Sequence, residues 1–285
     1  MRSRLPHLVA RSAELLLGRR HLARLARVLG DHARLDVPNG METNGELLVQ
    51  AVAVRRAGGG PLTALDVGAN RGAWSQHLLR ACDAAGAYVT LHAFEPSAHT
   101  FGLLQEALAP LIGPRVTLVN RALSDDEGTA VLYQVAPGAG SNSMYASTGR
   151  HGSPVAETIE VTTLDRYCAA SGIGQVDLLK VDAEGHDLLV LTGAGRLFGE
   201  QRIAMAQFEY NWRWIGARRF LKDAFDLLEP LGYRIGKVTP RGIELYAGWH
   251  PELETFREGN YVALRSDVVR HVRTVAWWNR VDRTT

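Results

Sequence analysis

The sequence predicts a doubly wound α/β domain with a mostly parallel sheet. Beyond about residue 60, apolar runs of strand length alternate with stretches of helical spacing. A turn with two glycines follows the first apolar run, and acidic residues stand directly after several of the others. The length of 285 residues fits one enlarged domain. The formal charge of +2 is too small to indicate the clustered basic excess of a nucleic-acid-binding protein.

Five apolar runs are predicted strands: Ala64–Val67, Val89–Phe94, Val116–Asn120, Asp177–Val181 and Ile203–Phe208. The predicted helices between and after them are Trp74–Cys82, Thr100–Leu108, His186–Thr192 and Arg218–Leu228. Strands separated by crossover helices must run parallel, with right-handed connections. The order of the elements therefore predicts a parallel sheet with helices on its faces.

Two stretches depart from this alternation. Thr129–Val135 and Glu157–Val161 are predicted strands on either side of a turn-rich segment at residues 137–143, which has the composition of a loop. After Pro230 the chain is rich in strand candidates, and we expect a late antiparallel hairpin among Tyr233–Val238, Ile243–Ala247 and Tyr261–Leu264.

Residues 1–58 are predicted to form an N-terminal helical cap, and residues 59–285 the main domain. Apolar residues recur at helical spacing over residues 1–35, which favours two short amphipathic helices with a cationic outer face. A third helix begins after Asn44 and ends at Gly58. The first two helices are expected to cover the main domain or a partner subunit. Weak association with a membrane surface, a disordered segment and an oligomer-specific segment are the alternatives.

The location of the protein is expected to be the cytoplasm. The two cysteines, Cys82 and Cys168, have no metal-binding or disulfide-framework spacing. No apolar run approaches the roughly 20 residues that span a bilayer, so we expect no stable membrane insertion. No targeting segment is expected, because Arg19 and Arg20 cut off the short apolar run before them.

The turn after the first predicted strand is the first candidate ligand loop. Gly68 and Gly72 let backbone pass close to a ligand, and the following helix offers free N–H groups. Asn70 stands where a dinucleotide-binding loop needs its second glycine, which disfavours a pyrophosphate. Asp66 precedes the loop and suits a ligand with a cationic amino group, such as the methionine end of S-adenosylmethionine.

Two further positions fit the rest of such a ligand. Glu95 ends the second predicted strand, where a carboxylate can accept both hydroxyls of a ribose. Asn120 and Ala122 follow the third predicted strand, near the place expected for an adenine. Asn120 also fits an ordinary turn residue.

Acidic residues crowd the end of the fourth predicted strand. Asp182, Glu184 and His186 stand within five residues, and Glu209 follows the fifth predicted strand. Each is a candidate catalytic group, with His186 attractive because the ordinary pKa of histidine lies near neutrality. A helix-start role for His186 and a structural hydrogen bond for Asp182 are the competing interpretations.

The ordered motifs resemble the FkbM family of S-adenosylmethionine-dependent methyltransferases. They are LDVGANRGAWS, HAFEPS, VNRALSDDEGTA, VTTLDRY, DLLKVDAEGHDLLVLTGA and QFEYN, and they cover about residues 60–265. The resemblance implies a Rossmann-like class I methyltransferase sheet, which is mostly parallel and seven-stranded. It implies O-methylation of a hydroxyl on a natural product, sugar or saccharide. It also assigns Asp66, Gly68 and Asn70 to the methionine side, Glu95 to the ribose, and Asp182 with Glu184 to the catalytic face.

Methyl transfer to an alcohol needs an acceptor held in line and a group that takes its proton. Asp182, Glu184, His186 and Glu209 are the candidates for that group. A Mg²⁺ ion held by Asp182, Glu184 and Glu209 is the alternative design. A nicotinamide-dependent oxidoreductase and a non-catalytic binding module are the rival functions.

The acceptor is expected to be a small or glycosylated molecule and not a nucleic acid, and a homo-oligomer remains open. The segment around Ser141, Asn142 and Ser143 is the expected acceptor-recognition loop, with Tyr210 and Trp212 across the cleft. Aromatic surfaces suit sugar rings or planar ligands. For the tryptophan, core packing is the equally weighted interpretation.

Overall fold

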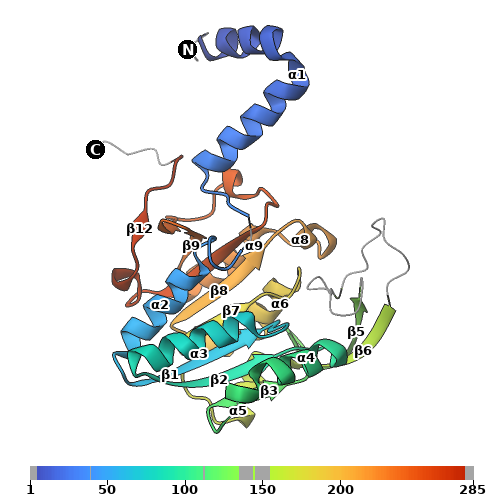
Figure 1. Cartoon of the computed structure of the whole chain (residues 1–285), viewed down its shortest axis with the longest axis vertical. Helices are drawn as coiled ribbons and strands as arrows, with labels where there is room; N and C mark the ends of the chain where they lie inside the picture. The colour runs from blue at the N-terminus through green and yellow to red at the C-terminus, as the bar shows by residue number, and fades with distance from the viewer. Residues whose placement is uncertain (1–4, 39, 112, 135–143, 145–154, 280–285) are drawn as a thin grey trace. The chain divides into compact units, whose positions relative to one another are not determined.

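The computed structural model describes residues 5–38, 40–111, 113–134, 144 and 155–279. The chain forms two compact units, one of residues 1–38 with 278–285 and the other of residues 39–277. In the first unit, α1 (Leu5–Ala33) consists of two helices that meet at Gly18, whose φ of 72° and ψ of 155° are not helical (Figure 1). Two helices were predicted here and two are found. In the same unit, the Arg34 guanidinium lies 5.0 Å from the centre of the Trp278 ring.

The second unit is built on a sheet with nine strands among the described residues, in the order β12-β10-β9-β11-β8-β7-β1-β2-β3. Their bounds are β1 Pro61–Val67, β2 Tyr88–Phe94, β3 Val116–Val119, β7 Leu178–Val181, β8 Met205–Tyr210, β9 Tyr233–Thr239, β10 Gly242–Leu245, β11 Gly259–Arg265 and β12 Thr274–Val275. The pairs from β3 through β1 to β8 are parallel, and β11 is antiparallel to both β8 and β9. The doubly wound, mostly parallel sheet with late antiparallel pairing is thus confirmed. Seven strands were expected; β10 and β12 extend the sheet at the β9 edge.

A separate three-stranded sheet has the order β4-β6-β5. It contains β4 (Ala122–Ser124), β5 (Gly128–Gln134) and β6 (Val155–Thr163), with β5 antiparallel to β6. Both β5 and β6 were predicted, as Thr129–Val135 and Glu157–Val161. The short strand β4 was not, because three residues give too little pattern to distinguish a strand from a loop.

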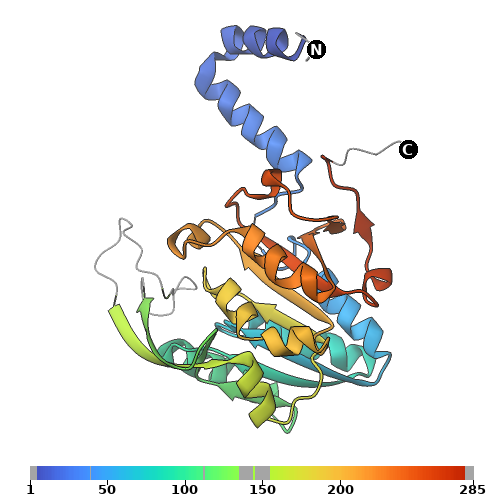
Figure 2. The same ribbon diagram turned by 180° about the vertical axis from the view of Figure 1, so that it is seen from behind.

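Helices cover both faces of the large sheet (Figures 1 and 2). Their bounds are α2 Glu46–Ala57, α3 Ala73–Ala85, α4 Ala98–Leu108, α5 Leu164–Ala170, α6 Asp187–Thr192, α7 Gly195–Gly199, α8 Arg213–Gly216 and α9 Leu221–Leu228, with 3-10 turns at Ala109–Leu111, Glu229–Leu231, Pro251–Leu253 and Val269–His271. One core cluster joins α2, α3 and α4 to one face, through residues such as Val49, Leu78 and Leu104. The other joins α6, α7 and α9 to the opposite face, through residues such as Leu191 and Phe225. This two-faced cover is what a doubly wound sheet requires.

Helix α2 belongs to the larger unit. Val49, Val52 and Ala53 are buried in the same core cluster as the apolar side chains of β1 and α3. The boundary between the compact units therefore falls at residue 38, whereas the sequence placed the end of the helical cap at residue 58. The apolar face of α2 explains the difference, since it packs on the sheet. In the part of the chain that the structure describes, no helix is long and apolar enough to cross a membrane.

Candidate functional site

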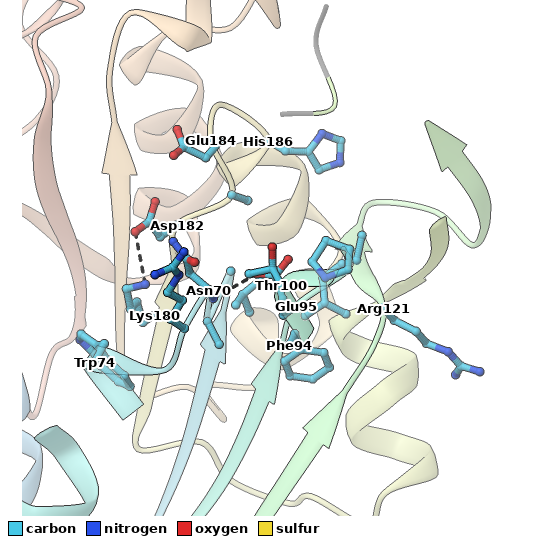
Figure 3. A pocket seen from close by; sticks show the side chains of 18 of the residues that line it. Asn70, Trp74, Phe94, Glu95, Thr100, Arg121, Lys180, Asp182, Glu184 and His186 are labelled. Carbon is cyan, nitrogen blue, oxygen red and sulfur yellow. Dashed lines mark hydrogen bonds and ion pairs between the residues drawn. The ribbon is translucent and has the colours of Figure 1, made fainter. Parts of the chain in front are cut away.

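A cavity of about 490 Å³ opens where β1, β2 and β7 reach their carboxyl ends (Figure 3). Open α/β sheets bind their ligands at this edge, and the volume is that of a small-molecule site. The polar and aromatic residues of its wall include Glu46, Asn70, Arg71, Trp74, Glu95, Arg121, Lys180, Asp182, Glu184 and His186. The predicted ligand loop, the predicted ribose acid and three of the predicted catalytic residues therefore meet around one space.

The loop after β1 passes very close to the chain after β7. Gly68 has a φ of 75°, and a Cβ atom there would lie 1.9 Å from the carbonyl oxygen of Asp182. Its N–H donates to the carbonyl oxygen of Phe94, 3.0 Å away, which ties the loop to β2 as well. Asn70 also has a positive φ, 49°. Gly68 and Asn70 line the cavity, whereas Gly72 caps α3 and lies against Leu104.

Glu95 connects this loop to the end of β2. One carboxylate oxygen accepts the Asn70 backbone N–H and the other accepts the Ser97 N–H, both at 3.0 Å. Burial raises the pKa of Glu95 to about 7, and these two N–H groups oppose the rise. A carboxylate has about four acceptor positions. Glu95, which lines the cavity, thus keeps acceptor capacity for a pair of hydroxyl groups.

Asn120 and Ala122, the two residues predicted to lie near an adenine, differ in their position relative to the cavity. Asn120 lies outside the cavity wall, where its side-chain amide donates to the carbonyl oxygens of Glu95 and Pro96 at 2.8 and 3.0 Å. It holds the turn that carries Glu95. Ala122 does line the cavity. The structure therefore supports a wall position for Ala122 and a positioning role for Asn120.

Asp66 does not line the cavity, which corrects the expectation that its carboxylate meets the ligand directly. It is fully buried, and its oxygens bind the Ser75 hydroxyl at 2.7 Å and the Lys180 ammonium at 3.4 Å. Asp66 and Lys180 are register partners on β1 and β7, which places both side chains on the same face of the sheet. Lys180 reaches the cavity wall instead.

Lys180 is one of the cavity residues that sequence reasoning missed. Its ammonium also lies 3.3 Å from the Asp182 carboxylate (Figure 3). Burial alone would lower the pKa of Lys180, but Asp66, Asp182 and Glu46 raise it above its ordinary value. The lysine is therefore charged at neutral pH. A lysine in an otherwise apolar strand was the available signal, since charged residues are seldom fully buried without a partner.

A second polar group lies beside this pair and includes a residue from α2. Glu46 lines the cavity, and its carboxylate accepts from the side-chain amides of Gln207 at 3.0 Å and Asn260 at 3.1 Å. Gln207 is the register partner of Lys180 on β8. A row of buried polar residues thus crosses β1, β7 and β8 and ends at Glu46. The Glu46 carboxylate and the Lys180 ammonium therefore both belong to the cavity wall.

The turn after β7 carries two of the predicted catalytic acids. Glu184 has a φ of 53° and is followed by Gly185 at 96°, which bends the chain sharply. The Glu184 carboxylate pairs with the Arg213 guanidinium at 2.9 Å. Burial and, to a smaller extent, the nearby Asp182 carboxylate raise the pKa of Glu184 to about 8, although the Arg213 guanidinium opposes the rise. Asp187 accepts the N–H groups of Ala183 and Gly185 at 3.1 Å each and so fixes this turn.

His186 lies at the opposite side of the turn from Glu184 (Figure 3). Its Nε2 is 2.8 Å from the Ser124 hydroxyl oxygen, and that hydroxyl donates to Asp125 at 2.9 Å. Because the single hydroxyl proton points to Asp125, Nε2 is the N–H donor and the lone pair is on Nδ1. Burial lowers the pKa of His186 to about 4, so the imidazole is neutral at pH 7.

Three predicted site residues lie outside the cavity wall. Glu209 is buried, its pKa is raised chiefly by that burial, and it accepts from the Asn211 amide. Tyr210 is fully buried, and its hydroxyl donates to Glu254 at 2.7 Å, which makes it a core residue. Trp212 is exposed and stacks on the Arg213 guanidinium at 4.9 Å. The burial of Glu209 and Tyr210 away from the cavity wall corrects the predicted catalytic role of Glu209 and the predicted substrate contact of Tyr210. The exposure of Trp212 excludes core packing, and its contact with substrate stays a prediction.

The other two open expectations concern metal and acceptor. Among the described residues, no three His, Cys, Asp or Glu side chains are grouped so that they could hold a metal ion. Asp182, Glu184 and Glu209, the ligands of the alternative Mg²⁺ design, are therefore not grouped as a metal site. Ser141, Asn142 and Ser143 lie outside the described residues.

Comparisons with known proteins agree with the sequence motifs. The sequence model of the methyltransferase FkbM domain matches residues 66–235, which is more than half of the chain. No curated protein matches the chain in sequence. Among solved structures, a methyltransferase FkbM from Methylobacillus flagellatus is similar at 16% identity and a TM-score of 0.44, over 71% of this chain and 43% of that one. This chain thus spans less than half the length of that protein.

Two other solved structures are similar to this chain at comparably low sequence identity and TM-score. A precorrin-6y C5,15-methyltransferase from Geobacter metallireducens has 13% identity, a TM-score of 0.38 and coverage of 77% of this chain and 88% of its own. M. capricolum TrmK in complex with S-adenosyl-homocysteine has 7% identity, a TM-score of 0.40 and coverage of 77% and 68%. Scores this low carry no functional argument, so the assignment rests on the match of the domain model. The chain belongs to the FkbM methyltransferase domain family.

Proposed function

We propose that this chain is an S-adenosylmethionine-dependent methyltransferase that methylates a hydroxyl oxygen of a natural product, sugar or saccharide. The observation that carries the proposal is the cavity edge where Glu95 binds the Asn70 backbone. Gly68 and Asn70 let the donor lie against backbone, and Glu95 offers acceptor positions to a ribose. The donor supplies a methyl group on a sulfonium, a good leaving group for in-line displacement.

The methionine end of the donor is a zwitterion, and the cavity has a matching pair of charges. The Lys180 ammonium has three N–H donors, two of which serve Asp66 and Asp182. The third is suited to the donor carboxylate. Glu46, held by Gln207 and Asn260, is suited to the donor ammonium. In this proposal Asp66 acts through Lys180, as a positioning residue.

The acceptor hydroxyl loses its proton as its oxygen attacks, and we propose that Nδ1 of His186 takes it. The relay from His186 through Ser124 to Asp125 fixes the tautomer and provides a negative charge for the imidazolium that forms. Glu184 is the second candidate, because a carboxylate with a pKa near 8 is a competent base once ionised. Its ion pair with Arg213 favours a positioning role instead.

Transfer of a radiolabelled methyl group tests the proposal. The chain is incubated with labelled S-adenosylmethionine and a panel of hydroxylated and glycosylated small molecules, with matched amines alongside. We expect label in a hydroxyl acceptor and production of S-adenosylhomocysteine, and loss of both in Glu95→Ala. Label only in amines would contradict the O-methyl assignment. Cofactor binding without transfer to any acceptor would favour a non-catalytic binding module.

A further inference from the structure

Helix α1 exposes an unusual number of large apolar side chains. Leu8, Val9, Leu15, Leu16, Leu25, Val28 and Leu29 are all exposed, with Leu15 at 82% and Leu16 at 85%. Single exposed apolar residues are normal on a protein surface, but a run of them along one helix indicates a binding face.

These residues are arranged by face in each half of the helix. In the second half, Leu22, Leu25 and Leu29 have the spacing i, i+3, i+7, which places them on one side. Arg20, Arg24 and Arg27 have the spacing i, i+4, i+7, which places them on another. Each half of α1 is therefore amphipathic when taken alone.

The first half of α1 shows the same division. Val9 and Leu16 are exposed on one side, at i and i+7, and His7 and Glu14 lie on the opposite side, also at i and i+7. Arg11 stands at i+3 from Leu8 and borders the apolar side. The non-helical backbone of Gly18 separates the two halves, so their apolar faces are set independently (Figure 1).

The charge of α1 indicates what this face meets. The helix has five arginines against two acids, Glu14 and Asp31, and no lysine. Two copies of such a helix would bring like charges together, whereas an anionic surface complements them. Basic amphipathic helices with leucine on the apolar face lie in the plane of a membrane surface. We infer that α1 binds the surface of a bilayer that contains anionic phospholipid.

Co-sedimentation of the full chain with vesicles tests this inference. The probes are phosphatidylcholine vesicles with and without about one quarter phosphatidylglycerol, at low and at high salt. We expect binding only to the anionic vesicles, and weaker binding at high salt. Replacing Arg20, Arg24 and Arg27 together with glutamine should lower the partition coefficient on the order of 100-fold, because each arginine contributes roughly fivefold. Leu25→Ser with Leu29→Ser should lower it by at least about tenfold.

Matched controls lie in the larger unit. Arg218→Gln with Arg219→Gln, and separately Ile215→Ser, make the same chemical changes at exposed positions outside α1 and should leave binding unchanged. Circular dichroism checks that each variant keeps its helix content. Absence of vesicle binding, equal binding to uncharged vesicles, or binding unaffected by the α1 substitutions would overturn the inference. A dimer that dissociates on Leu25→Ser with Leu29→Ser, with no vesicle binding, would assign the face to a second copy instead.

Discussion

The Glu95 carboxylate accepts a hydrogen bond from the Asn70 backbone N–H at 3.0 Å, which joins the end of β2 to the loop after β1. If Glu95 also binds the ribose, Glu95→Gln should weaken S-adenosylhomocysteine binding by about 10- to 100-fold, the effect of losing a charged acceptor. Glu157→Gln is the matched control, since Glu157 accepts the Ala98 N–H at the start of the next helix but lies outside the cavity wall. Equal affinities for the two variants, by calorimetry, would remove Glu95 from the ribose site.

The raised pKa of Glu95 predicts how cofactor binding depends on pH. The pKa of Glu95 is about 7 instead of its ordinary 4.5, so the ionised form is lost as the pH falls through about 7. Binding to the ionised acceptor should therefore weaken below about pH 7 and not first below pH 4.5. Calorimetry over this range should show the loss in the native chain, and Glu95→Gln should remove that part of the dependence.

Gly68→Ala should damage the protein more than an equivalent substitution in open space. A Cβ at Gly68 would lie 1.9 Å from the Asp182 carbonyl oxygen, so the loop or the chain after β7 must move. Gly86 has a similar positive φ, 68°, with nothing within 4 Å of its added Cβ. Gly86→Ala should cost about 1 kcal/mol from backbone conformation alone. We expect Gly68→Ala to cost clearly more in urea unfolding and to abolish cofactor binding; equal costs would refute the close approach.

Lys180 and Asp66 should behave as one unit in stability measurements. Lys180→Met leaves the buried Asp66 carboxylate without its cation and should destabilise the fold by about 3–5 kcal/mol. In the double variant with Asp66→Asn the losses should not add, with a coupling of at least about 1 kcal/mol. Lys222→Met, which breaks an exposed pair with Asp226, should cost less than about 1 kcal/mol. Additive losses in urea titrations would show that the two side chains do not interact.

The pH–rate profile distinguishes the two candidate bases. A base must be deprotonated, so kcat/KM for the acceptor, at saturating donor, rises with pH through the pKa of the base. If His186 takes the proton, the rise is centred near pH 4 and the rate is level around neutrality. If Glu184 takes it, the rate still rises through about pH 8. We expect the first profile, with a large loss of kcat in His186→Asn; a limb near pH 8 that disappears in Glu184→Gln would assign the base to Glu184.

The sequence was sufficient to predict the frame of the fold and the edge at which the site lies. The apolar runs at β1, β2, β7 and β8 are strong signals because a parallel strand is buried on both faces. The glycine at position 68 was informative for a related reason. The loop after β1 passes within contact distance of Asp182, just after β7, and a residue with a Cβ atom at position 68 would not admit that approach.

The residues that sequence reasoning misplaced share a physical cause. Asp66 was predicted to contact the ligand because its position on one strand does not show which side chain the neighbouring strand places beside it. That side chain is Lys180 on β7, which is in register with Asp66. Tyr210 looked like a cleft aromatic, but Glu254, far along the chain, satisfies its hydroxyl within the core. Glu46 was missed because it precedes the family motifs and reaches the cavity only through the packing of α2.

Titration of the chain with S-adenosylhomocysteine by calorimetry tests the central claim most directly. We expect saturable binding to one site per chain, which is lost in Gly68→Ala and strongly weakened in Glu95→Gln but not in Glu157→Gln. A folded chain that shows no heat of binding at millimolar ligand, or that binds equally well in all three variants, would contradict it.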